Sequence, residues 1–297
     1  MRQRADGARP GVLRLSVFAP QLKRGPLDRA DTRVSLHMPS RPRHAPSSVK
    51  GSPFLARVML RKDRIQPAVH PFNIPLLQHG LDIELSTPVT LLVGENGSGK
   101  STLLEALAWA VGFSSQGGNR DHHFAEGDDG HALGRALHLS WRQRVTDGFF
   151  LRAETFFNFA TYLETVGSTF GSYGGQSLHA QSHGEAFLSL FQHRFEDGLY
   201  LLDEPEAALS PQRQLAFLGI LHSLTASRIA QFIIATHSPM LLTFPGAAVL
   251  SLDGAGIRRV AFEDTEHYRI TKDFLDAPER FYRHLFEKED EMGDSAV

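Results

Sequence analysis

The chain has 297 residues, of which 41% are hydrophobic, so it can form a soluble fold with a substantial core. It contains no cysteine, which excludes disulfides, thiolate metal sites and cysteine nucleophiles. The formal net charge is -2, but residues 1–64 hold 15 Lys+Arg against 4 Asp+Glu, and the remainder holds 16 against 29. An acidic body argues against a broad, sequence-independent grip on DNA, although it leaves room for a local basic patch.

Residues 1–52 are rich in Arg, Pro and Ser and show no sustained periodicity, so we predict a disordered basic extension. They lack the apolar core of a signal peptide. A basic arm that binds nucleic acid is one alternative, and a start of translation further downstream, for which Met38 is available, is another. The sequence favours one domain over residues 53–288 and an acidic tail over residues 289–297.

The domain is predicted to begin with strands and a glycine-rich loop. Apolar residues alternate with charged ones from Phe54, and Val89–Val93 is a short apolar run typical of a buried strand. Residues 101–111 carry leucines at helical spacing. The sequence GENGSGKST between strand and helix fits the phosphate-loop pattern, in which glycines let backbone N–H groups point at phosphates, lysine supplies a charge and serine a magnesium ligand. The predicted phosphate-binding residues are Gly94, Glu95, Asn96, Gly97, Ser98, Gly99, Lys100, Ser101 and Thr102.

A loop, a hairpin and a helical subdomain are expected next. Residues 114–134 are polar and glycine-rich, and their His and Asp residues lack metal-ligand spacing, so a solvated loop is favoured over a metal site. Residues 137–141 and 149–151 are predicted to pair as a hairpin. A compact helical subdomain is expected over about residues 153–192.

One helix in this subdomain begins in an anion-binding pattern. Serine followed by glycine at a helix start presents a hydroxyl and free N–H groups along the helix axis. The segment QSHGE also fits an ordinary helix N-cap. Its candidate anion-binding residues are Ser182, Gly184 and Glu185.

Two carboxylates follow a buried strand at Leu199–Leu202. In open α/β sheets, ligands bind at the carboxyl ends of the strands. Asp203 is placed to help hold magnesium there, and Glu204 to polarise an attacking water. Glu206 suits a cap of the following helix better.

A further buried strand, Phe232–Ala235, ends in Thr-His-Ser-Pro. A lone histidine is usually structural, but His237 follows a strand end as the two carboxylates do and is therefore a candidate for contact with a γ-phosphate. Residues 232–252 are apolar overall, yet His237 and several Pro and Gly residues interrupt them, so they do not predict a membrane span. A terminal helix is expected over Asp273–Phe286.

The ordered set GENGSGKST, QSHGE, LYLLDEPE and ATHSP resembles the ABC-type ATPases, in particular the small soluble AAA-family ATPases of the SMC/RecF/OLD type. The resemblance covers about residues 54–286. It implies an α/β fold of the P-loop NTPase class, with a mixed central sheet flanked by helices, a small helical subdomain and an N-terminal antiparallel β part. It also implies ATP and Mg²⁺ as cofactors and hydrolysis of ATP to ADP and phosphate.

The same resemblance assigns roles to individual residues. Lys100, Glu204 and His237 are implied to be catalytic, and Ser101 and Asp203 to bind magnesium. In this family the signature segment, here QSHGE, closes on the γ-phosphate bound by a second subunit. The resemblance therefore implies an ATP-dependent head-to-tail homodimer.

Some positions depart from the family pattern. His183 stands where transporters usually carry glycine, and Ser210 where many D-loops carry aspartate. No glutamine occupies the expected Q-loop, whose region contains Glu154 instead. Phe72 is the candidate for an aromatic that stacks on adenine, although such a phenylalanine is more often part of the core. The sequence also has no room for a long coiled coil after Lys100 or for a C-terminal Toprim domain.

The motifs leave the cellular role open. An ATPase coupled to an unknown protein partner is the main interpretation. One alternative is a DNA repair or defence ATPase with nucleic acid as partner, which the acidic body disfavours. The others are the nucleotide-binding subunit of a membrane transporter, with no transmembrane segment of its own, and an ATP-dependent switch with little turnover. The composition favours the cytoplasm.

Overall fold

The computed structural model describes residues 51–114, 129–153, 156, 183–194, 197–253 and 256–293. The extension predicted over residues 1–52 lies outside the described residues, apart from its last two positions. Most of the predicted helical subdomain, Glu154 and Ser182 lie outside them as well. These expectations stay predictions.

Within the described residues, six strands form a mixed sheet in the order β5-β6-β7-β3-β8-β9. All neighbours are parallel except β9, which runs antiparallel to β8. The sheet confirms the predicted α/β fold with a mixed central sheet. Its strands are β3 (Val89–Val93), β5 (Gly148–Arg152), β6 (Gly198–Asp203), β7 (Ala230–Ala235), β8 (Ala248–Asp253) and β9 (Gly256–Val260).

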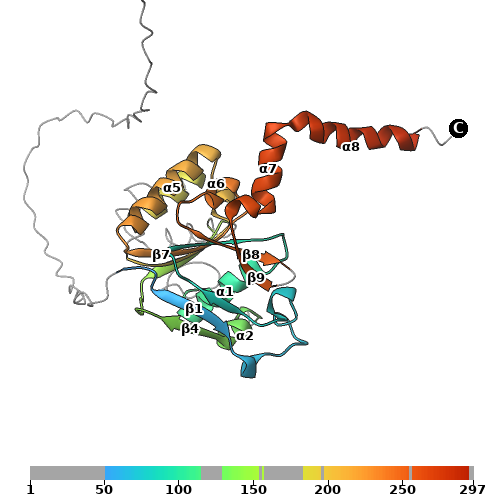
Figure 1. The fold of residues 1–297 in the computed structure, drawn as a ribbon. Coiled ribbons are helices and arrows are strands. Elements are labelled where there is room, and N and C mark those ends of the chain that lie inside the picture. The colour runs from blue at the N-terminus through green and yellow to red at the C-terminus, as the bar shows by residue number, and fades with distance from the viewer. Residues whose placement is uncertain are drawn as a thin grey trace, which may run out of the picture. The chain divides into compact units, whose positions relative to one another are not determined.

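The central strands are apolar because both faces of the sheet are covered. Every residue of β3, β6 and β7 is buried. Alternate residues point into two separate clusters: Leu91 and Phe232 lie in one, and Leu92 and Ile233 in the other. The helices and the small sheet that pack on these faces are visible in Figure 1.

Helices α4 (His183–Arg194) and α5 (Pro211–Ala226) contribute phenylalanines to the first cluster, which also contains Phe156. Helices α1 (Lys100–Val111) and α2 (Asp129–Ala136) contribute to the second. The remaining helical elements are short or follow the sheet: η1 (Lys62–Arg64), η2 (Pro75–Leu77), η5 (Pro205–Ala208), α6 (Pro239–Leu242), η6 (Phe262–Asp264), α7 (Glu266–Asp276) and α8 (Pro278–Gly293).

A small antiparallel sheet, in the order β2-β1-β4, confirms the predicted N-terminal β part. It consists of β1 (Leu55–Leu60), β2 (Asp82–Glu84) and β4 (Leu137–Trp141). Gln231 on β7 connects it to the large sheet: its Oε1 accepts from the backbone N–H of Phe54 at 2.7 Å and of Leu55 at 2.8 Å, and its Nε2 donates to the carbonyl of Leu55 at 2.9 Å. The Gln231 side chain is fully buried, so it can replace a strand-to-strand ladder between the two sheets.

Two local expectations, the hairpin and the single terminal helix, are wrong. The predicted hairpin does not form, because β5 pairs in parallel with β6 instead of with β4. Phe149 and Phe150 are buried in opposite clusters, and only the large sheet covers both faces of such a strand. Phe72 is 4% exposed and belongs to the second cluster, so it is a core residue and not a platform for adenine.

The predicted terminal helix Asp273–Phe286 is also wrong, since α7 and α8 are separate helices. Ala277 between them is non-helical (φ -151°, ψ 65°). Pro278 disfavours a helical conformation at the residue before it and is well suited to the first turn of the next helix. Helix α8 continues to Gly293, into the segment predicted as an acidic tail.

Candidate functional site

The glycine-rich loop joins β3 to α1 and has no room for side chains at two positions. A Cβ on Gly94 (φ +153°) would lie 2.3 Å from the carbonyl oxygen of Leu252, and one on Gly99 (φ +96°) would lie 3.0 Å from Cδ1 of Ile74. Gly99 is the N-cap of α1 and offers no side chain to its free N–H groups. The amides at this helix start are therefore available to an anion.

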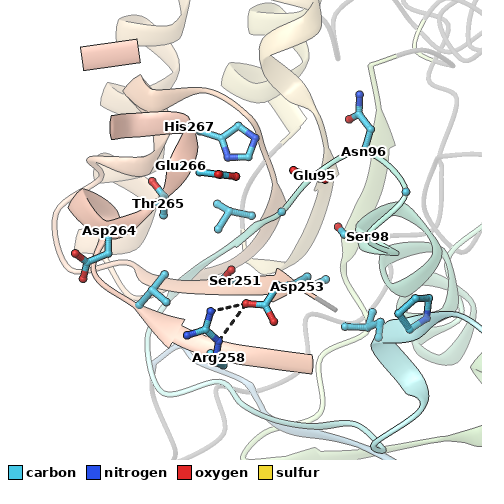
Figure 2. A pocket seen from close by; sticks show the side chains of 17 residues that line it. Glu95, Asn96, Ser98, Ser251, Asp253, Arg258, Asp264, Thr265, Glu266 and His267 are labelled. Carbon is cyan, nitrogen blue, oxygen red and sulfur yellow. Dashed lines mark hydrogen bonds and ion pairs between the residues drawn. The ribbon is translucent and has the colours of Figure 1, made fainter. Parts of the chain in front are cut away.

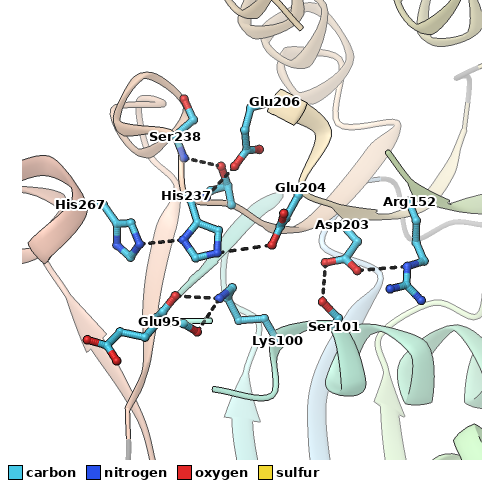
Figure 3. A network of polar contacts seen from close by, with 12 residues as sticks. Glu95, Lys100, Ser101, Arg152, Asp203, Glu204, Glu206, His237, Ser238 and His267 are labelled. Atoms are coloured by element: carbon cyan, nitrogen blue, oxygen red, sulfur yellow. Dashed lines mark hydrogen bonds and ion pairs between the residues drawn. The ribbon is translucent and has the colours of Figure 1, made fainter. Parts of the chain in front are cut away.

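Lys100 folds back over the loop that precedes it. Its amine donates to the carbonyl oxygens of Gly94 at 2.7 Å and Glu95 at 2.9 Å (Figure 3). The residue is 4% exposed, and burial lowers the pKa of the ammonium group, while the carboxylates of Glu204 and Asp203 act in the opposite direction. A cation is thus held inside the loop, facing two carboxylates.

Ser101 and Asp203 meet where β6 ends. The Ser101 hydroxyl donates to Oδ1 of Asp203 at 3.1 Å. Burial raises the pKa of Asp203 to about 6, although the charge of Arg152 partly opposes the shift. A hydroxyl and a carboxylate at hydrogen-bond distance are two hard oxygen donors, so the pair fits Mg²⁺.

Arg152 is a site residue that sequence reasoning missed. It ends β5, and the parallel register pairs it with Asp203 on β6. Its Nε lies 3.5 Å from Oδ2 of Asp203, and its guanidinium also pairs with Glu105 on α1. The parallel register that brings Arg152 beside Asp203 is a tertiary relationship, and no motif surrounds it.

Glu204 and His237 come from neighbouring strands. Glu204 has a left-handed backbone (φ 49°, ψ 52°), a conformation that non-glycine residues adopt rarely and mostly where function requires it. Its N–H donates to the carbonyl of Ala235 at 2.9 Å, which fixes the turn. Oε1 of Glu204 lies 3.4 Å from Nε2 of His237. The structure therefore places Lys100, Glu204 and His237 close together.

Glu206 holds the loop that carries His237. Its Oε1 accepts from the backbone N–H of His237 at 2.6 Å. The expectation that Glu206 caps the following helix is wrong, because its carboxylate turns toward the end of β7 instead. Burial raises the pKa of this carboxyl.

His267 at the start of α7 completes the cluster and was also missed. Its Nε2 lies 2.7 Å from Nδ1 of His237 (Figure 3). Burial lowers the pKa of both imidazoles, and the nearby charge of Lys100 lowers each further. Neutral rings can share one hydrogen bond, with one nitrogen as donor and the other as acceptor.

Two segments of the chain match family models. Residues 69–138, which include the glycine-rich loop, match a model described as "AAA domain". Residues 183–243, which include Asp203, Glu204 and His237, match a second model whose description reads "AAA domain" and refers to the AbiEii toxin and a type IV TA system. Together the two matches cover less than half of the chain, and they show that these two segments are similar to AAA domains.

Solved structures similar to this chain include ATP-binding cassettes and an SMC head domain. The SMC head domain from Thermotoga maritima is 17% identical, with a TM-score of 0.40 over 70% of this chain and 98% of that chain. The protein cbiO1 from Clostridium perfringens, part of the ABC transporter complex cbiONQ, is 16% identical, with a TM-score of 0.41 over 78% and 99%. No curated protein matches the chain.

A hollow of about 700 Å³ opens beside the glycine-rich loop between β3 and α1 (Figure 2). One wall is the loop itself, and the others come from η2, from β8 and β9, and from the start of α7. The Asp253–Arg258 ion pair and His267 lie in its lining. Its volume suits a nucleoside, and Phe72 is not among its lining residues.

Gly184 and Glu185, the described residues of the predicted anion-binding set at the start of α4, lie against α5. A Cβ on Gly184 would lie 2.6 Å from Cδ of Arg213 and 3.0 Å from the carbonyl of Ala208. Glu185 forms an ion pair with Arg213 at 3.1 Å. The role of Gly184 and Glu185 in nucleotide binding stays a prediction.

Gln214 on α5 links the segment after Asp203 to the segment after β7. The Ser238 hydroxyl donates to Oε1 of Gln214 at 2.6 Å, and Nε2 of Gln214 donates to the carbonyl of Leu209 at 3.2 Å. A glutamine in a helix has no sequence signature for this role. It ties together the loops that follow the two strands carrying Glu204 and His237.

In the part of the chain that the structure describes, no helix has both the length and the apolar character that crossing a membrane requires. Groups of three or more His, Asp or Glu side chains able to hold a metal ion are likewise not found there.

Proposed function

We propose that the protein binds ATP with Mg²⁺ at Gly94–Thr102 and hydrolyses it to ADP and phosphate. The main support is the convergence of Lys100, Ser101 and Asp203 with Glu204 and His237 at the carboxyl edge of a parallel sheet. Groups on α1, at the end of β6 and after β7 meet where ligands of α/β sheets bind. Phosphoryl transfer depends mainly on positioned charges of this kind.

Lys100 and the amides at the start of α1 neutralise the phosphates. The amine, now on the Gly94 and Glu95 carbonyls, would donate to phosphate oxygens in their place. Ser101 and Asp203 would hold Mg²⁺, which supplies charge stabilisation to the β- and γ-phosphate oxygens. The hollow between the P-loop and α7 would receive the nucleoside.

Glu204 orients the attacking water, and His237 contacts the γ-phosphate. An ionised Glu204 favours the His237 tautomer with the proton on Nε2, because that N–H faces Oε1 at 3.4 Å. Nδ1 of His237 then accepts from Nε2–H of His267. His267, His237 and Glu204 thus form a series of polar contacts that ends at the water oriented by Glu204.

ATP also drives formation of a head-to-tail homodimer in this proposal. Ser182, Gly184 and Glu185 would close on the nucleotide held by the second subunit, so the anion lies between two helix N-termini. An unknown protein partner would receive the resulting motion.

The test is ATP hydrolysis per subunit over a concentration series of the full chain, with nucleotide binding measured in parallel. We expect a specific rate that rises with protein concentration, and an ATP-bound Glu204→Gln variant that is dimeric and inactive. A chain that fails to bind ATP would overturn the whole proposal. Binding and turnover at a rate independent of concentration would overturn the dimer alone.

A further inference from the structure

A second hollow, of about 460 Å³, lies on the small sheet and is lined by arginines. It is bounded by η1, α1, α2 and β4, which lie close together in Figure 1. Arg61 is the N-cap of η1 and Arg64 its last residue, Arg135 is on α2, and Arg144 follows β4. All four are exposed. None of these residues takes part in the nucleotide site.

The charged side chains that line this hollow are all basic. Its lining contains four arginines and His138 but no acidic residue. Among the described residues, Asp63 forms ion pairs with Arg61 at 3.0 Å and Arg64 at 3.6 Å, and both pairs are solvent-exposed. Exposed pairs of this kind contribute little and are readily exchanged. On a body with more acidic than basic residues, the hollow is a local site for anions.

Aromatic rings lie among these charges. The chain has two tryptophans, Trp109 and Trp141, and both line this hollow, partly exposed. The Arg135 guanidinium stands 5.7 Å from the centroid of the Trp109 ring. Gly134 allows this approach, because a Cβ there would lie 2.5 Å from Cε3 of Trp109. Flat apolar rings beside guanidinium groups suit unpaired bases joined by phosphates.

We propose that this hollow binds single-stranded nucleic acid. The arginines on η1 and after β4 neutralise backbone phosphates, and a base stacks against a tryptophan. Single strands are favoured over acidic peptides because the lining combines aromatic surface with guanidinium groups. The proposal does not rest on ATP turnover, since the hollow shares no residue with the P-loop site.

Intrinsic fluorescence provides a local reporter, because both tryptophans are in the hollow. Full-length protein is titrated with an unlabelled oligothymidylate of about 20 nucleotides, without ATP. We expect saturable quenching of tryptophan fluorescence. The logarithm of the affinity should fall linearly with the logarithm of salt concentration.

Charge reversal distinguishes this site from other basic segments. The double variant Arg64→Glu/Arg144→Glu should bind at least about tenfold more weakly, and its salt slope should fall by about 1.4 if two phosphate contacts are lost. The matched control, Arg280→Glu/Arg283→Glu on α8, makes the same change in net charge and should bind like the wild type. Equal weakening by both pairs would overturn the proposal.

Three other outcomes would overturn it. A fluorescently labelled oligothymidylate that binds without tryptophan quenching would place the nucleic acid elsewhere, including on the basic residues 1–52. Quenching of equal strength by polyglutamate or polyphosphate would show that the hollow binds anions by charge alone, without any preference for bases. Equal affinity for a duplex of the same length would exclude the preference for unpaired bases. Unchanged ATP hydrolysis in Arg64→Glu/Arg144→Glu would confirm that the two sites are separate.

Discussion

His267 Nε2 lies 2.7 Å from His237 Nδ1, so the histidine that faces Glu204 is itself oriented by a second histidine on a different element. His237 follows β7 and His267 begins α7. Their hydrogen bond fixes which nitrogen of His237 is directed at Glu204. Removing such a partner changes the orientation and tautomer of a functional histidine while leaving it in place.

His267→Ala should therefore lower kcat by about tenfold. His267→Gln, which keeps a donor at similar reach, should restore part of the rate. His79→Ala, at an exposed position, is the matched control. Because His267 also lines the nucleoside hollow, nucleotide affinity must be measured beside kcat. A rise in the dissociation constant with unchanged kcat would assign His267 to binding instead of positioning.

The raised pKa of Asp203 predicts how stability depends on pH in nucleotide-free, metal-free protein. A carboxyl whose folded pKa is about 6 instead of 3.8 binds its proton more readily when folded, so its charge destabilises the fold above pH 6. Asp203→Asn should raise the free energy of unfolding at pH 7.5 by about 2–3 kcal/mol, and the difference should vanish near pH 4.

Urea denaturation of both proteins across this pH range, with chelator present, measures the difference directly. His237, His267 and Glu206 titrate in both proteins and cancel in the comparison. A variant that is less stable than the wild type at pH 7.5 would show that the Ser101 and Arg152 contacts outweigh the cost of burial.

Gln231→Leu should destabilise the protein by about 3 kcal/mol. The substitution leaves two buried N–H groups and one carbonyl of Phe54 and Leu55 without partners, and each such group costs about 1–3 kcal/mol if unrelaxed. Thermal or urea denaturation measures the loss, with Gln78→Leu at an exposed position as control. An unchanged midpoint would mean that the small sheet is held by its apolar contacts alone.

Gln214→Met should reduce ATP turnover several-fold while nucleotide affinity is retained. The substitution keeps the length of the side chain but removes the hydrogen bonds to Ser238 and Leu209 that join the two strand-end loops. Gln212→Met, on the exposed side of the same helix, should leave turnover unchanged. Full activity in Gln214→Met would show that the loops are positioned independently.

Much of the site could be predicted from the sequence because its residues directly follow short apolar runs, which are typical of buried strands. The loop from Gly94 and the pair Asp203-Glu204 each follow an apolar run, and parallel strands place such ends at one edge. Arg152 was missed because its relation to Asp203 exists only in the register of β5 and β6. His267 was missed for the same kind of reason, since 30 positions separate it from His237 and no pattern joins them.

The errors also have physical causes. Period-two alternation cannot say which sheet a strand joins, and β5 is assigned to the large sheet by its burial on both faces. Phe72 lies in a proline-bounded loop, where local sequence does not show whether a ring turns inward. Pro278 marks the break between α7 and α8, because proline disfavours a helical conformation at the residue before it. A prediction based on helical spacing alone does not take this effect into account.

Strand β7 connects two regions of the molecule. Gln231, near one end, is bonded to the backbone of the small sheet that carries the arginine-lined hollow, and His237 follows the other end. All six residues of the strand are buried between two neighbours, so it can shift lengthwise only with them. A displacement of the small sheet would therefore either break the three buried hydrogen bonds of Gln231 or move β7, and with it His237.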